Sequence, residues 1–225
     1  MEPYSWPEPQ GQMTFPVAKA GYPLIFGAAF VTLILALLGM TYLTLMGLVI
    51  TICFCGFFRD PDRVVPNHPE AVVSPADGKV ISVSDVGDTP FYEGRCKKIS
   101  IFMSVFNVHV NRIPYAGSIK KVSYHPGKFF AANLDKASLQ NEHNALYLET
   151  AEGQHLCVVQ IAGLIARRII CKVQAGNEML KGQRYGIICF GSRIDLYLPI
   201  HAKIEVGIGD KVKAGSSIIG RLAKI

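Results

Sequence analysis

Residues 187 to 198 read Ile-Ile-Cys-Phe-Gly-Ser-Arg-Ile-Asp-Leu-Tyr-Leu, and they form two apolar, strand-like runs that meet at Gly191-Ser192. Glycine adopts backbone angles that are closed to other residues, and serine carries a hydroxyl close to its own backbone. A glycine between two strand-like runs is typical of a β-bulge. The same pair also has the local chemistry of a self-cleaving peptide, because the Ser192 hydroxyl can attack the Gly191 carbonyl and turn the amide into an ester. The pair alone favours the bulge.

The composition indicates one globular domain with a membrane appendage. The chain has 225 residues, half of them hydrophobic, and a formal net charge of +6. A basic balance suits an anionic membrane surface or nucleic acid. The sequence has no zinc-finger spacing and no dense basic run, so we expect a membrane partner and no nucleic acid. The six cysteines contain no C-x-x-C pair. They are typical of small buried hydrophobes in a reducing compartment, and we expect no metal site.

The hydrophobic excess is concentrated near the N-terminus. Residues 1–19 are rich in proline and glycine and predict an irregular arm, whereas residues 20–58 contain no charged side chain. One membrane helix needs only about 20 apolar residues, so this run holds one overlong helix or two short ones. Lys19 flanks one end and Arg59 the other, and cytoplasmic ends carry basic residues. We therefore expect a transmembrane helical hairpin in the cell (inner) membrane, with the rest of the chain on the cytoplasmic side.

The remaining sequence predicts a β-rich domain. A charged, proline-broken linker covers residues 59–72, and residues 73–225 alternate apolar runs with Gly and Pro turns. Residues 73–80 and 206–215 resemble the opening and closing turns of barrel-sandwich domains, such as carrier modules and membrane-fusion adaptors. The fold class is thus mostly β, with a compact barrel-sandwich-like domain. Strands are expected at 79–86, 97–104, 118–124, 145–149, 156–161, 168–173, 185–189, 194–198 and 217–222.

Several short motifs occur in a specific order around this domain. They are Phe57-Phe58-Arg59-Asp60-Pro61, Ser74-Pro75-Ala76-Asp77-Gly78, Val108-His109-Val110-Asn111-Arg112, Asn141-Glu142-His143-Asn144 and Ala166-Arg167-Arg168-Ile169. Together with Gly191-Ser192, their order and spacing resemble the phosphatidylserine decarboxylase family, in particular its short branch. The resemblance runs from about Phe57 to the C-terminus.

The resemblance implies a proenzyme that cuts itself between Gly191 and Ser192. Chains 1–191 and 192–225 would stay associated, and Ser192 would become a covalent pyruvoyl group. That group would take up the electron pair released when carbon dioxide leaves the serine head group of phosphatidylserine. The product would be phosphatidylethanolamine, and no metal is required.

The resemblance also assigns roles to polar residues. Asp77 matches the aspartate of the family's self-cleavage triad. Longer relatives carry two histidines three residues apart, where this chain has His109 and Arg112. His109 is therefore the expected base for activating Ser192, although it aligns with the histidine used in decarboxylation and can serve either step or both. On the residues alone, Asp77 also fits a turn and His109 fits a satisfied core histidine.

Four further residues are candidates for binding the substrate. Arg112 is suited to holding a carboxylate or a phosphate. His125 precedes Pro126-Gly127 and can flank the substrate pocket, and Arg167 and Arg168 form a pair with one side chain reaching the lipid phosphate. A loop histidine and a solvated basic face are the structural alternatives.

A second function class stays open at this point. A non-enzymatic, membrane-anchored barrel-sandwich adaptor would explain the anchor and the β-domain, but it leaves Asp77, His109 and Ser192 without a role. An ordinary serine hydrolase is disfavoured because the sequence has no Gly-x-Ser-x-Gly elbow. The long strand-like surfaces also allow a homodimer.

Overall fold

The computed structural model describes residues 16–130, 140–163, 168–189 and 191–223. The chain separates into two compact units, one ending at Asp62 and the other beginning at Arg63. Arg167, one of the expected lipid-binding residues, lies outside the described residues.

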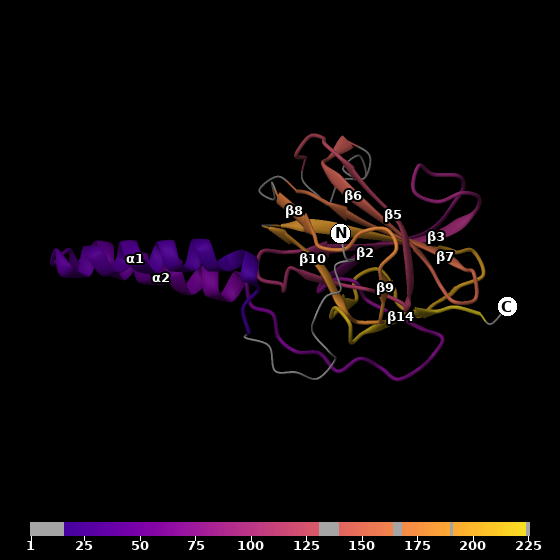
Figure 1. Ribbon diagram of the computed structural model, residues 1–225, viewed down its shortest axis with the longest axis horizontal. Helices are drawn as coiled ribbons and strands as arrows, with labels where there is room; N and C mark the ends of the chain where they lie inside the picture. The colour runs from indigo at the N-terminus through magenta and orange to yellow at the C-terminus, as the bar shows by residue number, and fades with distance from the viewer. Residues whose placement is uncertain (1–15, 131–139, 164–167, 190, 224–225) are drawn as a thin grey trace. The chain divides into compact units, whose positions relative to one another are not determined.

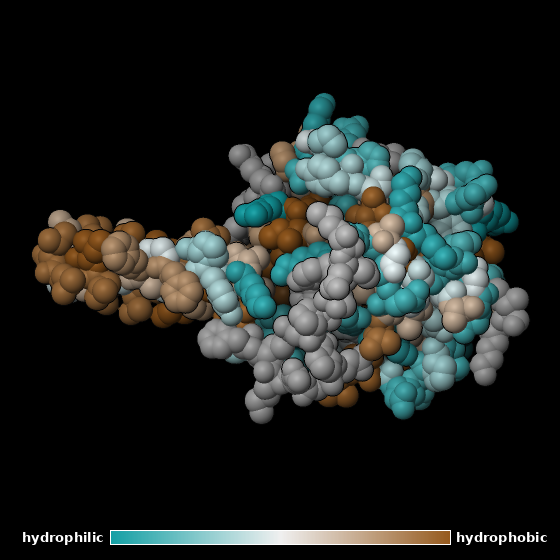
Figure 2. Space-filling model, viewed as in Figure 1, coloured by the Kyte–Doolittle hydropathy of each residue, from teal (hydrophilic) through white to brown (hydrophobic). Residues whose placement is uncertain are grey.

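The first unit is a helical hairpin. A 3₁₀ turn, η1 (Lys19–Gly21), leads into α1 (Tyr22–Leu37), and α2 (Thr41–Phe57) follows after a turn in which Gly39 has a φ of +71°. Most of the side chains of both helices are exposed, and Figure 2 shows the pair covered in hydrophobic side chains. Residues Lys19–Leu37 are long and apolar enough to cross a membrane, whereas α2 is shorter. The predicted N-terminal hairpin is therefore confirmed as a fold.

The two helices of the hairpin pack closely. Near the middle, the Oγ1 atoms of Thr32 and Thr51 lie 3.4 Å apart. A Cβ atom at Gly47 would lie 2.6 Å from Thr32 Oγ1, so the glycine permits this approach. At the open end, the Ala18 N–H donates to the Phe58 carbonyl at 2.7 Å, which joins the segments before α1 and after α2.

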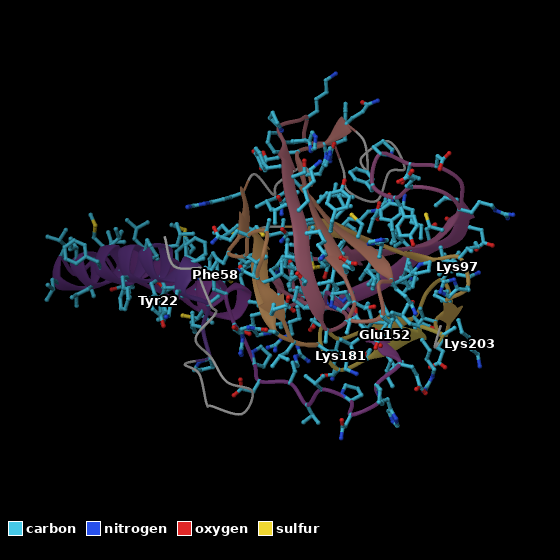
Figure 3. The ribbon with its side chains drawn as sticks, turned by 45° about the vertical axis from the view of Figure 1, so that its right-hand side comes forward. Tyr22, Phe58, Lys97, Glu152, Lys181 and Lys203 are labelled. Carbon is cyan, nitrogen blue, oxygen red and sulfur yellow. The ribbon has the colours of Figure 1, made fainter. Side chains whose placement is uncertain are left out.

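The open end brings the start of α1 and the end of α2 together. Figure 3 shows Tyr22, the first residue of α1, and Phe58, the residue after α2, at the same end of the hairpin. This is the arrangement that the basic residues at both ends of the apolar run predicted.

The second unit is built from antiparallel strands (Figure 1). An eight-stranded sheet has the order β13-β2-β3-β11-β7-β6-β5-β9, and two three-stranded sheets have the orders β4-β10-β8 and β1-β14-β12. The mostly β prediction is confirmed, and each of the nine expected strands is present; the additional ones, β1, β4, β9, β12 and β13, have only two or three residues. The strands are β1 (Ala71–Val73), β2 (Gly78–Val86), β3 (Cys96–Met103), β4 (Val110–Arg112), β5 (Gly117–His125), β6 (His143–Glu149), β7 (His155–Ile161), β8 (Arg168–Cys171), β9 (Glu178–Met179), β10 (Arg184–Cys189), β11 (Ser192–Pro199), β12 (Lys203–Ile204), β13 (Lys211–Val212) and β14 (Ile218–Arg221).

Strand β11 is buried on both faces. It lies between β3 and β7, with Ser192 opposite Met103 and Arg193 opposite Ile161. One face of the large sheet, which we call the inner face, packs into the main core through residues such as Ile194. The outer face forms a second core that includes Tyr197 and Ile161. All eight residues of β11 are consequently buried.

Gly191 marks the passage between two sheets. Strand β10 ends at Cys189 in the three-stranded β4-β10-β8 sheet, and β11 begins at Ser192 in the eight-stranded sheet. Gly191 has a φ of +66°, in the left-handed region that favours glycine. The glycine is therefore a junction between sheets, and a bulge within one strand does not describe it.

The large sheet has two ends that differ in chemistry. The Ser192 end carries Met103, Ile161 and His143 on neighbouring strands. The far end carries charged side chains, and Figure 3 shows Lys97 and Glu152 there. Gly191-Ser192 and these charged side chains therefore occupy opposite ends of the sheet.

Candidate active site

Ser192 is the first residue of β11, and its side chain is held in the interior. The residue is 0% exposed, and its Oγ makes no hydrogen bond among the residues that the structure describes. Because side chains two apart in a strand share a face, Ser192 points to the inner face with Ile194. Leaving a buried hydroxyl without a partner costs about 1–3 kcal/mol. Within the described chain, the Ser192 hydroxyl therefore has no structural role as a hydrogen-bonding group.

His109 lies next to the expected cut. It immediately precedes β4, and its backbone carbonyl accepts a hydrogen bond from the Ile188 N–H at 3.4 Å. The Gly191 N–H in turn donates to His109 Nε2 at 3.4 Å. A ring nitrogen that accepts a hydrogen bond carries no proton, which is the state a general base requires. The structure thus places His109 at Gly191, the residue before Ser192.

Asp77 is engaged elsewhere. Its Oδ1 accepts a hydrogen bond from the Ala214 N–H at 2.7 Å, and its Oδ2 pairs with Arg63 Nη2 at 2.8 Å. Asp77 precedes β2, and β3 separates β2 from β11, so two strand spacings of about 5 Å each lie between Asp77 and Ser192. The carboxylate thus holds the turn before Gly215 and pairs with Arg63.

Arg112 is the last residue of β4, whereas His109 lies just before that strand. Arg112 is buried, and its Nη1 donates to the Gly182 carbonyl at 3.1 Å. A Cβ atom at Gly215 would lie 2.9 Å from Arg112 Cδ, so the side chain packs between two glycine turns.

His125 forms a stacked pair with His143. The two residues are register partners on β5 and β6, and their rings lie 4.9 Å apart at an angle of 17°. His143 Nδ1 lies 2.7 Å from the Asn141 carbonyl, and Phe91 packs edge-on against the His143 ring. Burial lowers the pKa of His143 below its usual value, and the neighbouring His125 lowers it further. The pair lies at the Ser192 end of the large sheet but on its outer face.

Arg168 lies close to the junction. It is exposed on β8 and is the register partner of Cys189, two residues before Gly191. Burial raises the pKa of the Cys189 thiol, and the Arg168 charge lowers it by a smaller amount. Of the expected arginine pair, Arg168 therefore places one positive charge beside the junction.

A buried ion pair directly follows Ser192, and the sequence reasoning did not assign it a role. Arg193 Nε lies 2.6 Å from Asp195 Oδ1, and Arg193 Nη2 lies 3.0 Å from Asp195 Oδ2. Arg193 Nη2 also donates to Ser100 Oγ at 3.1 Å, and Lys98 Nζ lies 3.2 Å from Asp195 Oδ2. Opposite charges two residues apart in an apolar strand are the signal that could have revealed the pair, because such side chains share one face.

A chain of buried carboxamides lies on the inner face, and it too was missed. Asn144 Nδ2 donates to Gln160 Oε1 at 3.1 Å, and Gln160 Nε2 donates to Asn111 Oδ1 at 2.8 Å. Asn111 Nδ2 then lies 3.8 Å from the Met103 sulfur. We call Asn144, Gln160 and Asn111 the amide relay. Asn144 and Gln160 lie on the consecutive strands β6 and β7, whereas Asn111 lies on β4, 49 residues from Gln160, so only the fold reveals the relay.

Comparison with known proteins identifies the family. The family model for phosphatidylserine decarboxylase matches residues 50–220. The chain is 47% identical to the phosphatidylserine decarboxylase proenzyme of Desulfotalea psychrophila over 94% of this chain and 99% of that protein. It is 46% identical to the proenzyme of Syntrophus aciditrophicus and 48% identical to that of Geotalea uraniireducens, each over more than nine-tenths of both chains. The site has a buried serine after a glycine at positive φ, and a histidine that accepts the N–H of that glycine. Because these matches cover most of its length, the chain belongs to the phosphatidylserine decarboxylase family and is an enzyme of that class.

Proposed function

We propose that this decarboxylase makes its own cofactor by cutting the chain between Gly191 and Ser192. One observation carries the proposal. The buried Ser192 hydroxyl has no hydrogen-bond partner in the described chain, and His109 Nε2 accepts the N–H of the preceding residue, Gly191. A pyruvoyl group derived from Ser192 fits this position, because the side chain already lies in an enclosed, partly polar interior. The adaptor alternative is set aside because the relatives are named as decarboxylase proenzymes.

The self-cleavage follows from the chemistry of these residues. His109 takes the Ser192 hydroxyl proton as Oγ attacks the Gly191 carbonyl carbon, the C–N bond breaks, and the freed nitrogen takes a proton. The resulting ester links Gly191 to the Ser192 oxygen. Loss of the Cα proton of residue 192 then breaks the Cβ–O bond, and Gly191 leaves as a carboxylate. Tautomerisation, addition of water and loss of ammonia convert the remaining dehydroalanine into pyruvoyl.

Asp77 contributes to this step from a distance. Its carboxylate binds the Ala214 amide, which belongs to the future short chain, and Arg63, which belongs to the long one. We propose that Asp77 keeps the two chains in register around the cut. Replacing Asp77 by asparagine should slow self-cleavage, since the amide pairs less strongly with Arg63.

The same residues then act on phosphatidylserine, with phosphatidylethanolamine and carbon dioxide as products. The pyruvoyl group supplies an acceptor for the electron pair released on decarboxylation. His109 remains beside the cut and holds or returns a proton there. Arg168, Arg167, Arg112 and His125 are the proposed contacts for the phosphate and carboxylate of the head group, with Arg168 the best placed because it lies exposed next to the junction.

The protein is proposed to work at the cytoplasmic face of the cell membrane, anchored by its hairpin. The turn between β3 and β4 joins the active-site strands and carries two exposed apolar residues, Val105 at 40% and Phe106 at 83%. Such a tip suits the interface of a bilayer, where aromatic side chains are favoured. The exposed Arg168 would attract anionic lipid.

The first experiment is the intact mass of the purified full chain in detergent beside the Ser192→Ala variant. We expect the wild type to resolve into chains 1–191 and 192–225, the latter lighter by one ammonia than a chain with N-terminal serine. Ser192→Ala should remain whole. A folded wild type that stays a single uncut chain would refute the proposal.

A second experiment tests the lipid-facing tip. Phe106→Ser should lower decarboxylation of phosphatidylserine in vesicles more than in detergent micelles, where the lipid is already dispersed. Leu180→Ser is the matched control, because Leu180 is 60% exposed but follows β9, which pairs with Gly117 at the far end of the large sheet. Equal losses for the two variants would argue against the tip.

A further inference from the structure

The amide relay is built as a one-way series of hydrogen bonds. Asn144 donates to Gln160, and Gln160 donates to Asn111, over distances of 3.1 and 2.8 Å. Asn111 and Gln160 are 0% exposed and Asn144 is 2% exposed. Hydrogen bonds that run in one direction polarise one another, so the last donor, Asn111 Nδ2, is the strengthened one.

This last donor contacts Met103, the residue that pairs with Ser192 across the sheet. Asn111 Nδ2 contacts the Met103 sulfur, and Met103 is the register partner of Ser192, with both side chains on the inner face. Asn111 also follows His109 by two residues, so the two side chains leave the chain on the same side. His109 Nε2 is already on the Gly191 amide. Asn111 and Ser192 therefore both adjoin Met103, and all three residues are buried.

The donor lacks an adequate acceptor. A thioether sulfur is a weak acceptor, and among the residues that the structure describes this 3.8 Å contact is the only hydrogen bond from Asn111 Nδ2. A fully buried carboxamide N–H with no better partner is costly in a core that could hold an apolar residue. Gly186 leaves room for the Gln160 carboxamide, because a Cβ atom at this position would lie 3.0 Å from Gln160 Nε2.

We propose that Asn111 Nδ2 donates a hydrogen bond to the ketone oxygen that residue 192 acquires when it becomes pyruvoyl. Gln160 and Asn144 are positioning residues that orient the Asn111 carboxamide. A donor on this oxygen withdraws electron density from the ketone carbon and makes it more reactive toward an amine, such as that of the substrate. This inference rests on the proposed function and assigns the relay a role within it.

The test uses the full chain in detergent and a probe other than the lipid. Hydroxylamine is a small amine nucleophile that reacts with a ketone, and the mass of the short chain reports the reaction. The rate is compared for the wild type, Asn111→Leu and Gln160→Met, together with kcat and KM for phosphatidylserine. Gln154→Leu is the matched control, because Gln154 is another buried amide but lies in the turn between β6 and β7, at the far end of the sheet.

We expect Asn111→Leu to be cut as the wild type is, and to react with hydroxylamine about 10-fold more slowly. Its kcat should fall about 10- to 100-fold with little change in KM, and Gln160→Met should show the same pattern to a smaller degree. Gln154→Leu should match the wild type in both assays. If Asn111→Leu is not cut, Gln160→Met decides the question.

Two failures can be told apart. A wild type that is not cut overturns the proposed function, and the inference with it. A wild type that is cut, with relay variants that react with hydroxylamine at the rate of Gln154→Leu, overturns the inference alone.

Discussion

The buried ion pair after the cut gives the sharpest prediction on stability. Replacing Asp195 by asparagine keeps the shape of the side chain and removes its charge. Both carboxylate oxygens of Asp195 are engaged, by Arg193 at 2.6 and 3.0 Å and by Lys98 at 3.2 Å, and the residue is 0% exposed. The variant therefore leaves a buried guanidinium without its counter-charge.

The expected loss follows from this geometry. Removing one partner of a buried ion pair typically costs about 3–5 kcal/mol, because the other charge stays in the interior uncompensated. Arg193 is 1% exposed and cannot reach water, whereas the Lys98 side chain is 17% exposed and can turn outward. We therefore count only Arg193 and expect about 3 kcal/mol. A whole domain has only about 5–15 kcal/mol of stability, so the effect would be large.

The assay is denaturant unfolding of the full chain in detergent, in a Ser192→Ala background. If the chain cuts itself as proposed, this background keeps it whole, so that unfolding does not depend on protein concentration. Near-ultraviolet circular dichroism of buried tyrosines such as Tyr197 reports the state of the β-domain. The control is Glu205→Gln, which breaks the pair with Arg221, where both side chains are about a third exposed. That loss should be below about 1 kcal/mol.

A double replacement separates the charge from the packing. Arg193→Leu with Asp195→Leu removes both charges together, and buried pairs replaced by apolar residues are often neutral or stabilising. We therefore expect the double variant to be more stable than Asp195→Asn. The reasoning is wrong if Asp195→Asn costs no more than the exposed control.

Three further predictions concern other parts of the chain. Gly186→Ala should destabilise the domain by about 1–3 kcal/mol and lower its melting temperature, since the new Cβ would lie 2.4 Å from a backbone oxygen of β8 and 3.0 Å from Gln160. His143 has a pKa below its usual 6.5, so the folded state binds fewer protons than the unfolded one just below that pH. Stability should thus fall on acidification below about pH 6.5, and unfolding curves of His143→Phe should show a smaller fall; an unchanged slope would contradict this. Cysteines placed at Thr32 and Thr51 should form a disulfide on mild oxidation when the native cysteines are replaced, because the two Oγ1 atoms lie 3.4 Å apart. Failure to cross-link, judged by mass, would count against the hairpin.

Much of the fold was predictable because its signals are local. Short apolar runs separated by Gly and Pro turns located the nine longer strands, and the uncharged run with basic flanks located the hairpin. Alternation along residues 193–196 puts Arg193 and Asp195 on the face opposite Ile194 and Leu196, and the structure has them there. What alternation could not reveal is that a second core covers the outer face as well, so that both charges are buried.

The candidate site was predictable only where residues adjoin the cut in sequence or in a motif. His109 was found because its motif is contiguous, and the structure places it on Gly191. Asn111 stands in the same motif without a role, and its significance depends on Gln160 and Asn144, which reach it through sheet pairing. The partners of Asp77 were also hidden, because Ala214 lies 137 residues away.

If the chain is cut as proposed, the position of β11 has a consequence for the lifetime of the enzyme. Strand β11 lies between β3 and β7, β13 pairs with β2, and β14 pairs with β1. The segment of 34 residues after Gly191 therefore forms strand pairs with several parts of the preceding chain. Before the cut, this insertion is part of one folding reaction. After it, a denatured molecule would have to recapture a diffusing peptide, and the long fragment would meanwhile present the open edges of β3 and β7 to its neighbours. Processing would thus make assembly a one-time event, and dilution or heat would turn a reversible transition into permanent inactivation.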